Sequence, residues 1–146
     1  MGWKFYSLDS LPDPYCIVWC KWPNRKLEPG LVVRPVLVRE SRILEDERTK
    51  TLYGALLVSF ATGELFKDKL GEIDLIIDDW AEVRTLGLHK PTRFSFDPRD
   101  QRLLPWSEEF FVAPAYVRDQ GIVAGALNPQ QIDRLRACLA KRSDRV

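Results

Sequence analysis

The sequence predicts a mainly β protein: a small antiparallel barrel, closed or half-closed, with a short internal helix and a C-terminal helix. Several short segments rich in β-branched and aromatic residues are separated by Gly, Pro, Asn and Asp, which is typical of strands joined by turns. Two helix-capping patterns, at Asp79 and Asn128, stand outside these segments. Many short strands with one terminal helix favour a small barrel.

Length and composition suit one globular domain. The chain has 146 residues, enough for one sizeable core, and a hydrophobic content of 45%. Its 22 basic and 21 acidic side chains give a net charge of +1, so no global field indicates a nucleic-acid or membrane partner. We expect a single domain over 1–146, with an N-terminal arm over 1–13, the barrel over 14–127 and a helix over 128–142.

The cysteines and the N-terminus indicate a cytoplasmic protein. Cys16, Cys20 and Cys138 are too few and too scattered for a disulfide framework or a zinc site. The N-terminus lacks the apolar stretch of a signal peptide, and the longest uncharged run is too short to cross a bilayer. We therefore expect reduced thiols, no metal or other cofactor, and no membrane partner.

The first predicted strand covers residues 15–21, with the sequence YCIVWCK. A two-residue period places Ile17 and Trp19 on the face opposite Val18. The following residues, 22–30, form a loop by their Pro, Asn and Gly content.

The second predicted strand, 30–40, holds an arginine and a proline inside an aliphatic run. The Arg34 guanidinium keeps its charge in a protein and is costly to bury without a partner. Pro35 lacks an N–H, so we expect the sheet to break step there. Arg34 is either a fixed anion site, or a side chain that snorkels to the surface or pairs with a structural carboxylate. This stretch alone leaves these alternatives open.

The next segments lead to a second polar position. Residues 41–50 carry mixed charge without a sustained period, as in a solvated loop or a strand extension into solvent. Residues 53–60, YGALLVSF, place apolar side chains on both faces of a strand. This pattern is typical of a central strand that is covered on each face. Thr62 and Gly63 follow and bring a hydroxyl and backbone N–H groups to the sheet rim.

A half-exposed strand and a short helix come next. Residues 72–78 largely alternate, and this pattern places Asp74 among the outward-facing side chains. Asp79 and Glu82 have the spacing of a capping box, which predicts a helix to about residue 87.

Further short strands precede the last element. Residues 92–96 alternate, with Arg93 and Ser95 on the face opposite the core side chains. We predict two more strands, over 101–106 and 109–112, on either side of a proline-containing link.

The last two elements are a strand and a helix. Residues 121–127, GIVAGAL, read as a small-residue strand whose glycines indicate close approach of another backbone. Asn128 and Gln131 form a capping-box variant that opens the C-terminal helix. Its predicted apolar stripe consists of Ile132, Leu135 and Leu139.

Most enzyme classes lack their motifs in this chain. We find no P-loop, dinucleotide fingerprint, nucleophile elbow or metalloprotease helix. His89 is the only histidine, and its surroundings, GLHKPT, predict a turn in which a surface role is expected. Helix capping accounts for Asp79 without catalysis.

Four segments in order, YCIVWCKWPN, GLVVRPVLV, YGALLVSFATGE and GLHKPTRFSF, resemble the PemK/MazF-like toxins of toxin–antitoxin modules. The resemblance covers residues 14–127, and its sharpest piece is Arg34-Pro35 before an aliphatic run. It implies an SH3-like barrel that forms a homodimer and cleaves single-stranded RNA without a metal. It also implies a cognate antitoxin whose extended C-terminal segment blocks the RNA groove.

The resemblance also implies catalytic residues. Arg34 matches the family's strand arginine, Thr62 matches its threonine after the third strand, and Arg93 and Ser95 fall near its later polar pair. Some members carry an acidic base where this chain has Ser95, so the loop residue Glu28 is an alternative proton acceptor.

Residue types suggest how RNA would bind. Trp19, Trp22 and Tyr53 are candidate stacking platforms for unpaired bases, and Arg25 and Lys26 are candidate phosphate contacts. The predicted function is a growth-inhibiting endoribonuclease that acts by attack of the RNA 2′-hydroxyl. The alternative is a non-catalytic small barrel that binds RNA or a protein partner.

Overall fold

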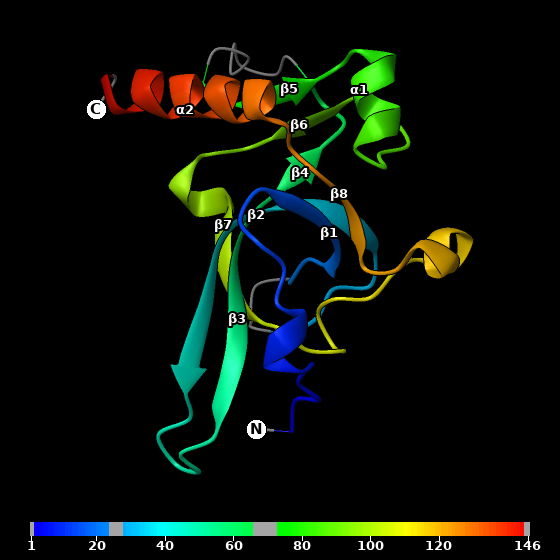
Figure 1. Ribbon diagram of the computed structural model, residues 1–146. Coiled ribbons are helices and arrows are strands. Elements are labelled where there is room, and N and C mark those ends of the chain that lie inside the picture. Colours follow the sequence, from blue (N-terminus) through cyan, green and yellow to red (C-terminus); the bar gives the residue numbers. More distant parts are fainter. Residues whose placement is uncertain (1, 24–27, 66–72, 145–146) are drawn as a thin grey trace.

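Two antiparallel sheets carry the fold of this computed structural model, which describes residues 2–23, 28–65 and 73–144 (Figure 1). The larger sheet has the strand order β7-β3-β2-β1-β8 and the smaller one β4-β6-β5. The strands are β1 (Cys16–Lys21), β2 (Val33–Glu45), β3 (Leu52–Ser59), β4 (Ala61–Thr62), β5 (Leu75–Ile77), β6 (Thr92–Phe94), β7 (Gln101–Pro105) and β8 (Val123–Ala126). The helices are α1 (Trp80–Thr85) and α2 (Pro129–Asp144), with 3-10 turns at Leu8–Ser10, Pro98–Asp100 and Ala115–Gln120.

The mainly β antiparallel class and both helices are confirmed. A closed barrel is not found in the described residues and stays a prediction.

Strands β1 and β2 supply both hydrophobic clusters of the core. Ile17 and Leu37 belong to the cluster that includes the two helices and the small sheet. Val18 and Val36 belong to a second cluster, with Phe110 at its centre. Adjacent strand residues point to opposite faces, as the alternation in residues 15–21 predicted, and β1 and the first half of β2 are therefore covered on both faces. Each fully buried aliphatic side chain contributes about 1.5–3 kcal/mol.

Strand β2 runs through Pro35 without interruption. Its register with β1 is regular from Leu37 to Val33, and Pro35 lies opposite Trp19. Strand β3 pairs with β2 only from Leu37 onward. Pro35 therefore sits where β2 has one hydrogen-bonded neighbour, a position that tolerates proline. The break predicted at Pro35 is wrong: the register shifts between Val38 and Glu40 instead.

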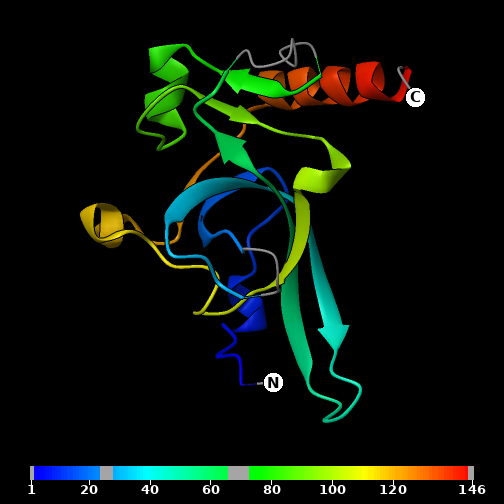
Figure 2. The same ribbon diagram turned by 180° about the vertical axis from the view of Figure 1, so that it is seen from behind.

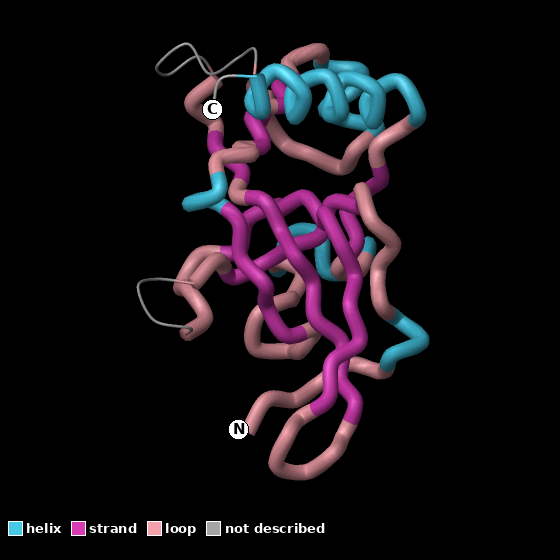
Figure 3. The backbone as a smooth tube through the Cα atoms, turned by 90° about the vertical axis from the view of Figure 1, so that its left-hand side faces the viewer, coloured by secondary structure: helices cyan, strands magenta, loops and turns pink. Residues whose placement is uncertain are grey.

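The β2–β3 hairpin extends away from the helices (Figure 3). Of the two alternatives for residues 41–50, the strand extension is found, because β2 continues to Glu45. The Asp46 carboxylate accepts hydrogen bonds from the backbone N–H groups of Arg48 and Thr49 and closes the tip. Lys50 completes the turn with a φ of 61°.

Asp79 and Asn128 both cap their helices, but the Glu82 carboxylate, predicted to complete a capping box with Asp79, accepts hydrogen bonds from Gln131 and Arg134 of α2. The Asp79 carboxylate accepts from the Ala81 N–H at 2.8 Å at the start of α1. Asn128 and Gln131 exchange hydrogen bonds between side chain and backbone, at 2.8 and 2.9 Å, at the start of α2. Helix α2 lies against the small sheet beside β5 (Figures 1 and 2), and its Leu135 is 1% exposed. No described helix is long and apolar enough to cross a membrane.

Of the two glycines in the strand predicted over 121–127, Gly125 makes the predicted close approach to another backbone, whereas no atom lies within 4 Å of the Cβ position of Gly121. A Cβ on Gly125 would meet the Leu86 carbonyl oxygen at 2.5 Å, and one on Gly87 would meet the Ala124 oxygen at 2.3 Å. The end of α1 is therefore pressed onto β8. The strand predicted over 109–112 is wrong, because this segment is a turn followed by extended chain that buries Phe110 and Phe111.

Candidate functional site

A pocket of about 390 Å³ is lined by both sheets. The large sheet supplies Trp19 from β1 and Arg34 and Pro35 from β2. The small sheet supplies Thr62 from β4 and Thr92 from β6. The other lining residues are Val32, Val33, Ala61, Gly63, Leu88, His89, Lys90 and Tyr116. Arg34 and Thr62, which are far apart in the sequence, thus share one pocket.

The pocket has a buried apolar floor and an exposed polar rim. Trp19 and Leu88 are 2% and 5% exposed. His89, Lys90 and Tyr116 are exposed. The His89 ring lies 4.9 Å from the Tyr116 ring and 5.9 Å from the Trp19 ring. An apolar floor with a few polar groups at its rim is the usual composition of a binding site.

Arg34 is a half-buried cation that has no charged partner among the described residues. Its guanidinium lies over the Phe60 ring at 5.2 Å, and within the described ranges it makes no ion pair or side-chain hydrogen bond. A structural carboxylate, one of the alternatives for Arg34, is therefore not found there. Its cross-strand neighbour is Cys20. Burial raises the pKa of the Cys20 thiol far above its usual range, and Arg34 offsets only part of this.

Thr62, Gly63 and Lys90 line the same part of the pocket wall, with Lys90 Nζ close to Gly63. The Thr62 hydroxyl oxygen accepts from the Glu64 N–H at 3.2 Å, which leaves the hydroxyl proton available for a ligand. Lys90 Nζ lies 3.2 Å from the point that a Gly63 Cβ would occupy. The absence of a side chain at Gly63 therefore gives the ammonium group room in the pocket.

A second pocket of about 240 Å³ adjoins the first. It shares Val32 and Arg34 with the first pocket, and it is otherwise lined by Trp22, Gly30, Leu31 and Phe60. The Trp22 and Phe60 rings lie 5.1 Å apart, and the Arg102 guanidinium lies 5.6 Å from the centre of the Trp22 ring. Arg34 thus stands between two pockets, each with a tryptophan in its wall.

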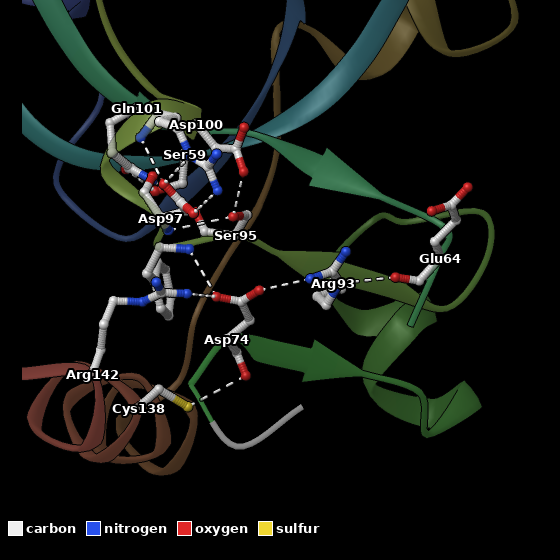
Figure 4. Close-up of polar contacts among 12 residues, drawn as sticks. Ser59, Glu64, Asp74, Arg93, Ser95, Asp97, Asp100, Gln101, Cys138 and Arg142 are labelled. Atoms are coloured by element: carbon white, nitrogen blue, oxygen red, sulfur yellow. Dashed lines mark hydrogen bonds and ion pairs between the residues drawn. The ribbon is translucent and has the colours of Figure 1, made fainter. Parts of the chain in front are cut away.

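Arg93 is buried and paired with Asp74 (Figure 4), and it is not among the residues that line the pocket. Arg93 Nη1 donates to Asp74 Oδ2 at 2.8 Å, and Arg93 Nε donates to the Glu64 carbonyl at 2.8 Å. Asp74 Oδ1 accepts from Arg142 Nη2 at 2.7 Å and from the Phe96 N–H at 3.0 Å. The outward position predicted for Asp74 is wrong, because its side chain is fully buried among these donors.

Arg93 does not line the pocket, but it supports one of its walls. Its bond to the Glu64 carbonyl holds the turn that follows Thr62, and Thr62 is its cross-strand neighbour in the small sheet. The geometry gives Arg93 a positioning contact with the Thr62 turn.

Ser95 is buried in a separate polar cluster (Figure 4). Its hydroxyl donates to Asp100 Oδ2 at 2.7 Å, and its carbonyl accepts from Gln101 Nε2 at 2.7 Å. In the same cluster, hydrogen bonds from the Arg99 side chain and backbone lower the pKa of Asp97 to about 2. Ser95 is not brought to the pocket with Arg34 and Thr62.

The other predicted site residues are dispersed. Glu28 is exposed and outside the lining of both pockets. Tyr53 packs against Phe5 with ring centres 4.9 Å apart and lines a different, smaller pocket. Arg25 and Lys26 lie outside the described residues.

Three rim residues escaped the sequence analysis. His89 and Lys90 follow one another in GLHKPT, and their position directly before the strand of Thr92 was the available signal. His89 does lie in the predicted turn between helix and strand, yet this turn borders the pocket. Nothing in the sequence around Tyr116 indicated its place at the rim.

Comparison with protein-family models and with curated proteins finds no match for this chain. A guanidinium, an ammonium, an imidazole and the hydroxyl-bearing side chains of Thr62, Thr92 and Tyr116 line a pocket with an apolar floor. Such a set of donors suits an anion attached to a planar, apolar group.

Proposed function

We propose that this protein is a metal-independent endoribonuclease of the PemK/MazF-like toxin type, which cleaves single-stranded RNA by attack of a 2′-hydroxyl on the adjacent phosphate. One observation carries the proposal: Arg34 and Thr62, contributed by different sheets, line the same pocket. They are also the two positions at which the resemblance implies catalytic residues.

The donors around the pocket match the charge that develops in this reaction. Attack by the 2′-hydroxyl produces a pentacovalent phosphorane with negative charge on its non-bridging oxygens. The Arg34 guanidinium presents a planar fork suited to two such oxygens. The Thr62 hydroxyl donates to a third acceptor, because its oxygen already accepts from the Glu64 N–H.

The aromatic side chains of the two pockets suit unpaired bases. Trp19 forms part of the floor of the first pocket, and Trp22 lies in the second. Arg34 stands between them, so a phosphate bound to Arg34 would have a flanking base on either side. Base–aromatic stacking contributes about 1–3 kcal/mol per base and tolerates any sequence.

The proposal extends to the fold and the partners. The two sheets are the strands of an SH3-like barrel, and the protein acts as a cytoplasmic homodimer restrained by a cognate antitoxin. The resemblance over residues 14–127 supports this part. Exposed apolar side chains beside the pockets, Leu31 at 97% and Val32 at 60%, offer a surface for an apolar partner segment.

The test compares Arg34→Ala with Arg42→Ala on a panel of single-stranded RNAs in the presence of a chelator. Arg42 is on the same strand, but its partner is the exposed Glu40 and it does not line the pocket. We expect the wild type and Arg42→Ala to release a 2′,3′-cyclic phosphate, and Arg34→Ala to lose about 10²–10³-fold in rate, as expected for removing one oxyanion donor. Chromatography of the products measures this.

Intact RNA after incubation with the wild type would contradict the enzyme. If the wild type binds RNA and forms no cyclic phosphate, the protein is a binding module instead. Circular dichroism of Arg34→Ala controls for folding, because the variant also loses the contact with Phe60, worth about 0.5–1 kcal/mol.

A further inference from the structure

The first pocket contains cations and hydroxyl groups, but no carboxylate among its described lining residues. Its titratable side chains are those of Arg34, His89, Lys90 and Tyr116. The proposed reaction needs a group that accepts the 2′-hydroxyl proton. A guanidinium stays charged in proteins, and lysine and tyrosine ordinarily hold their protons at neutral pH. An imidazole is the side chain that exchanges its proton in the neutral range.

We propose that His89 is the catalytic base of this pocket and that Lys90 is the acid that protonates the leaving group, an assignment that rests on the proposed function. Both residues are adjacent in the link between α1 and β6, and both line the pocket with Arg34 and Thr62. Glu28, the base suggested by the sequence, lies outside this lining.

The fold fixes the place of the imidazole. The preceding Leu88 is buried, and its N–H donates to the Val83 carbonyl at 2.9 Å. The His89 ring is tilted by 33° against Trp19 and by 72° against Tyr116. The Trp19 and Tyr116 rings also lie 6.2 Å apart, so the three rings form a triangular cluster. Contact with two neighbouring rings restricts the rotamers of the His89 side chain, which favours a defined geometry for proton transfer.

The step balances without any further reagent. The imidazole of His89 takes the proton of the 2′-hydroxyl as the 2′-oxygen forms a bond to phosphorus. The bond between phosphorus and the 5′-oxygen breaks, and the Lys90 ammonium transfers a proton to that oxygen. The products are a 2′,3′-cyclic phosphate and a 5′-hydroxyl, with a protonated imidazole and a neutral amine that then exchange protons with water.

A purely structural role for His89 has to be separated from this one. The imidazole could serve only as one ring of the cluster that it forms with Trp19 and Tyr116. His89→Phe keeps a ring at this position and removes the proton acceptor, whereas His89→Ala removes both. Arg84→Ala is the control, because Arg84 is exposed on α1 and does not line the pocket.

The experiment measures kcat/KM for an RNA that the wild type cleaves. We expect His89→Phe and His89→Ala to lose about 10²–10⁴-fold, the usual contribution of general acid–base catalysis, and Arg84→Ala to match the wild type. Added imidazole should restore part of the rate of His89→Ala. The 2′-O-methyl analogue of the same RNA should bind the wild type and both variants alike.

A substrate with a 5′-bridging sulfur distinguishes base from acid. A thiolate leaves without protonation, so Lys90→Ala should regain nearly the full wild-type rate on this substrate. His89→Ala should stay slow, because the 2′-hydroxyl still has to lose its proton.

Each contrary outcome identifies what has failed. If the wild type cleaves RNA and His89→Phe cleaves it equally fast, His89 is a stacking ring and the assignment is wrong. If His89→Ala recovers on the sulfur substrate, His89 is the acid rather than the base, which also overturns the assignment. If the wild type cleaves no RNA, the proposed function fails and the assignment fails with it.

Discussion

Asp74 connects three parts of the chain through one buried carboxylate. It binds Arg93 of β6 at 2.8 Å, Arg142 of α2 at 2.7 Å and the Phe96 N–H at 3.0 Å. Two cations share this carboxylate, so its charge is matched in a region with little access to water. Buried charges of this kind are stable only when they are paired and hydrogen-bonded.

Asp74→Asn should therefore destabilise the protein strongly. The substitution keeps the shape of the side chain but removes the carboxylate charge that pairs with Arg93 and Arg142. Removing one partner of a buried ion pair costs about 3–5 kcal/mol. Urea unfolding measures the loss. Asp78→Asn, an exposed carboxylate at the end of β5, is the matched control and should change stability by about 0.5 kcal/mol or less. Equal stability of the two variants would contradict this role of Asp74.

The residues of the candidate site were predictable to different degrees. The resemblance named Arg34 and Thr62, and the structure places both in one pocket. The buried position of Asp74 was not predictable from its strand. A two-residue alternation describes only the strand itself and contains no information about the arginines, Arg93 and Arg142, that pair with Asp74 in the fold. His89 was recognised as a turn residue, but a turn's position relative to a pocket is a property of the tertiary fold.

At the scale of elements, the junction of α1 with β8 determines where the rim of the pocket lies. Gly125 admits the Leu86 carbonyl, and Gly87, with a φ of 73°, turns the chain toward Leu88 and His89. A left-handed φ at the end of a helix favours glycine. The rim residues therefore follow directly from a contact between two backbones.

Gly125→Ala should displace this junction. Its Cβ would lie 2.5 Å from the Leu86 oxygen, which is backbone and cannot rotate away. We expect a loss of about 1–3 kcal/mol in stability, as for overpacking, together with slower RNA cleavage because His89 and Lys90 shift. Gly2→Ala, with no atom within 4 Å of the new Cβ, is the control. An unchanged melting temperature and cleavage rate would contradict this prediction, because they would show that the contact between α1 and β8 accommodates the added methyl group.

The elements themselves were largely predictable because local chemistry decides them. The caps at Asp79 and Asn128 form from residues within one turn, so sequence spacing suffices. The segment around Phe110 was read as a strand because buried aromatic residues have high strand propensity. In the structure a turn buries the two consecutive side chains of Phe110 and Phe111. Strand propensity alone does not distinguish such a turn from a strand.

At the scale of the molecule, β1 and β2 join the two hydrophobic clusters into one structure. Ile17 and Val18 are neighbours in sequence, yet they are buried in different clusters. Loss of β1 would open both clusters together. This arrangement favours the single domain predicted over 1–146, with cooperative unfolding.

Ile17→Ala and Val18→Ala test this cooperativity. Each should lower the same single unfolding transition, Ile17→Ala by about 2–5 kcal/mol and Val18→Ala by less, because fewer atoms are removed. Far-ultraviolet circular dichroism and tryptophan fluorescence should report coincident curves in urea. Two transitions, with each substitution shifting a different one, would indicate two independently folding parts.

The contacts of Asp74 bear on how genetic selections with this protein would be interpreted. Arg93 reaches the Thr62 turn through Glu64, and Arg142 brings the last helix to the same carboxylate. If the protein halts growth by cutting RNA, cells that survive its expression will carry substitutions at Asp74, Arg93 and Arg142 as well as at Arg34. None of those first three side chains lines the pocket. A selection for survival alone would therefore assign too many residues to the RNA-contacting surface. Measuring the amount of folded protein in each survivor would separate substitutions that destabilise the fold from those that remove a contact with RNA.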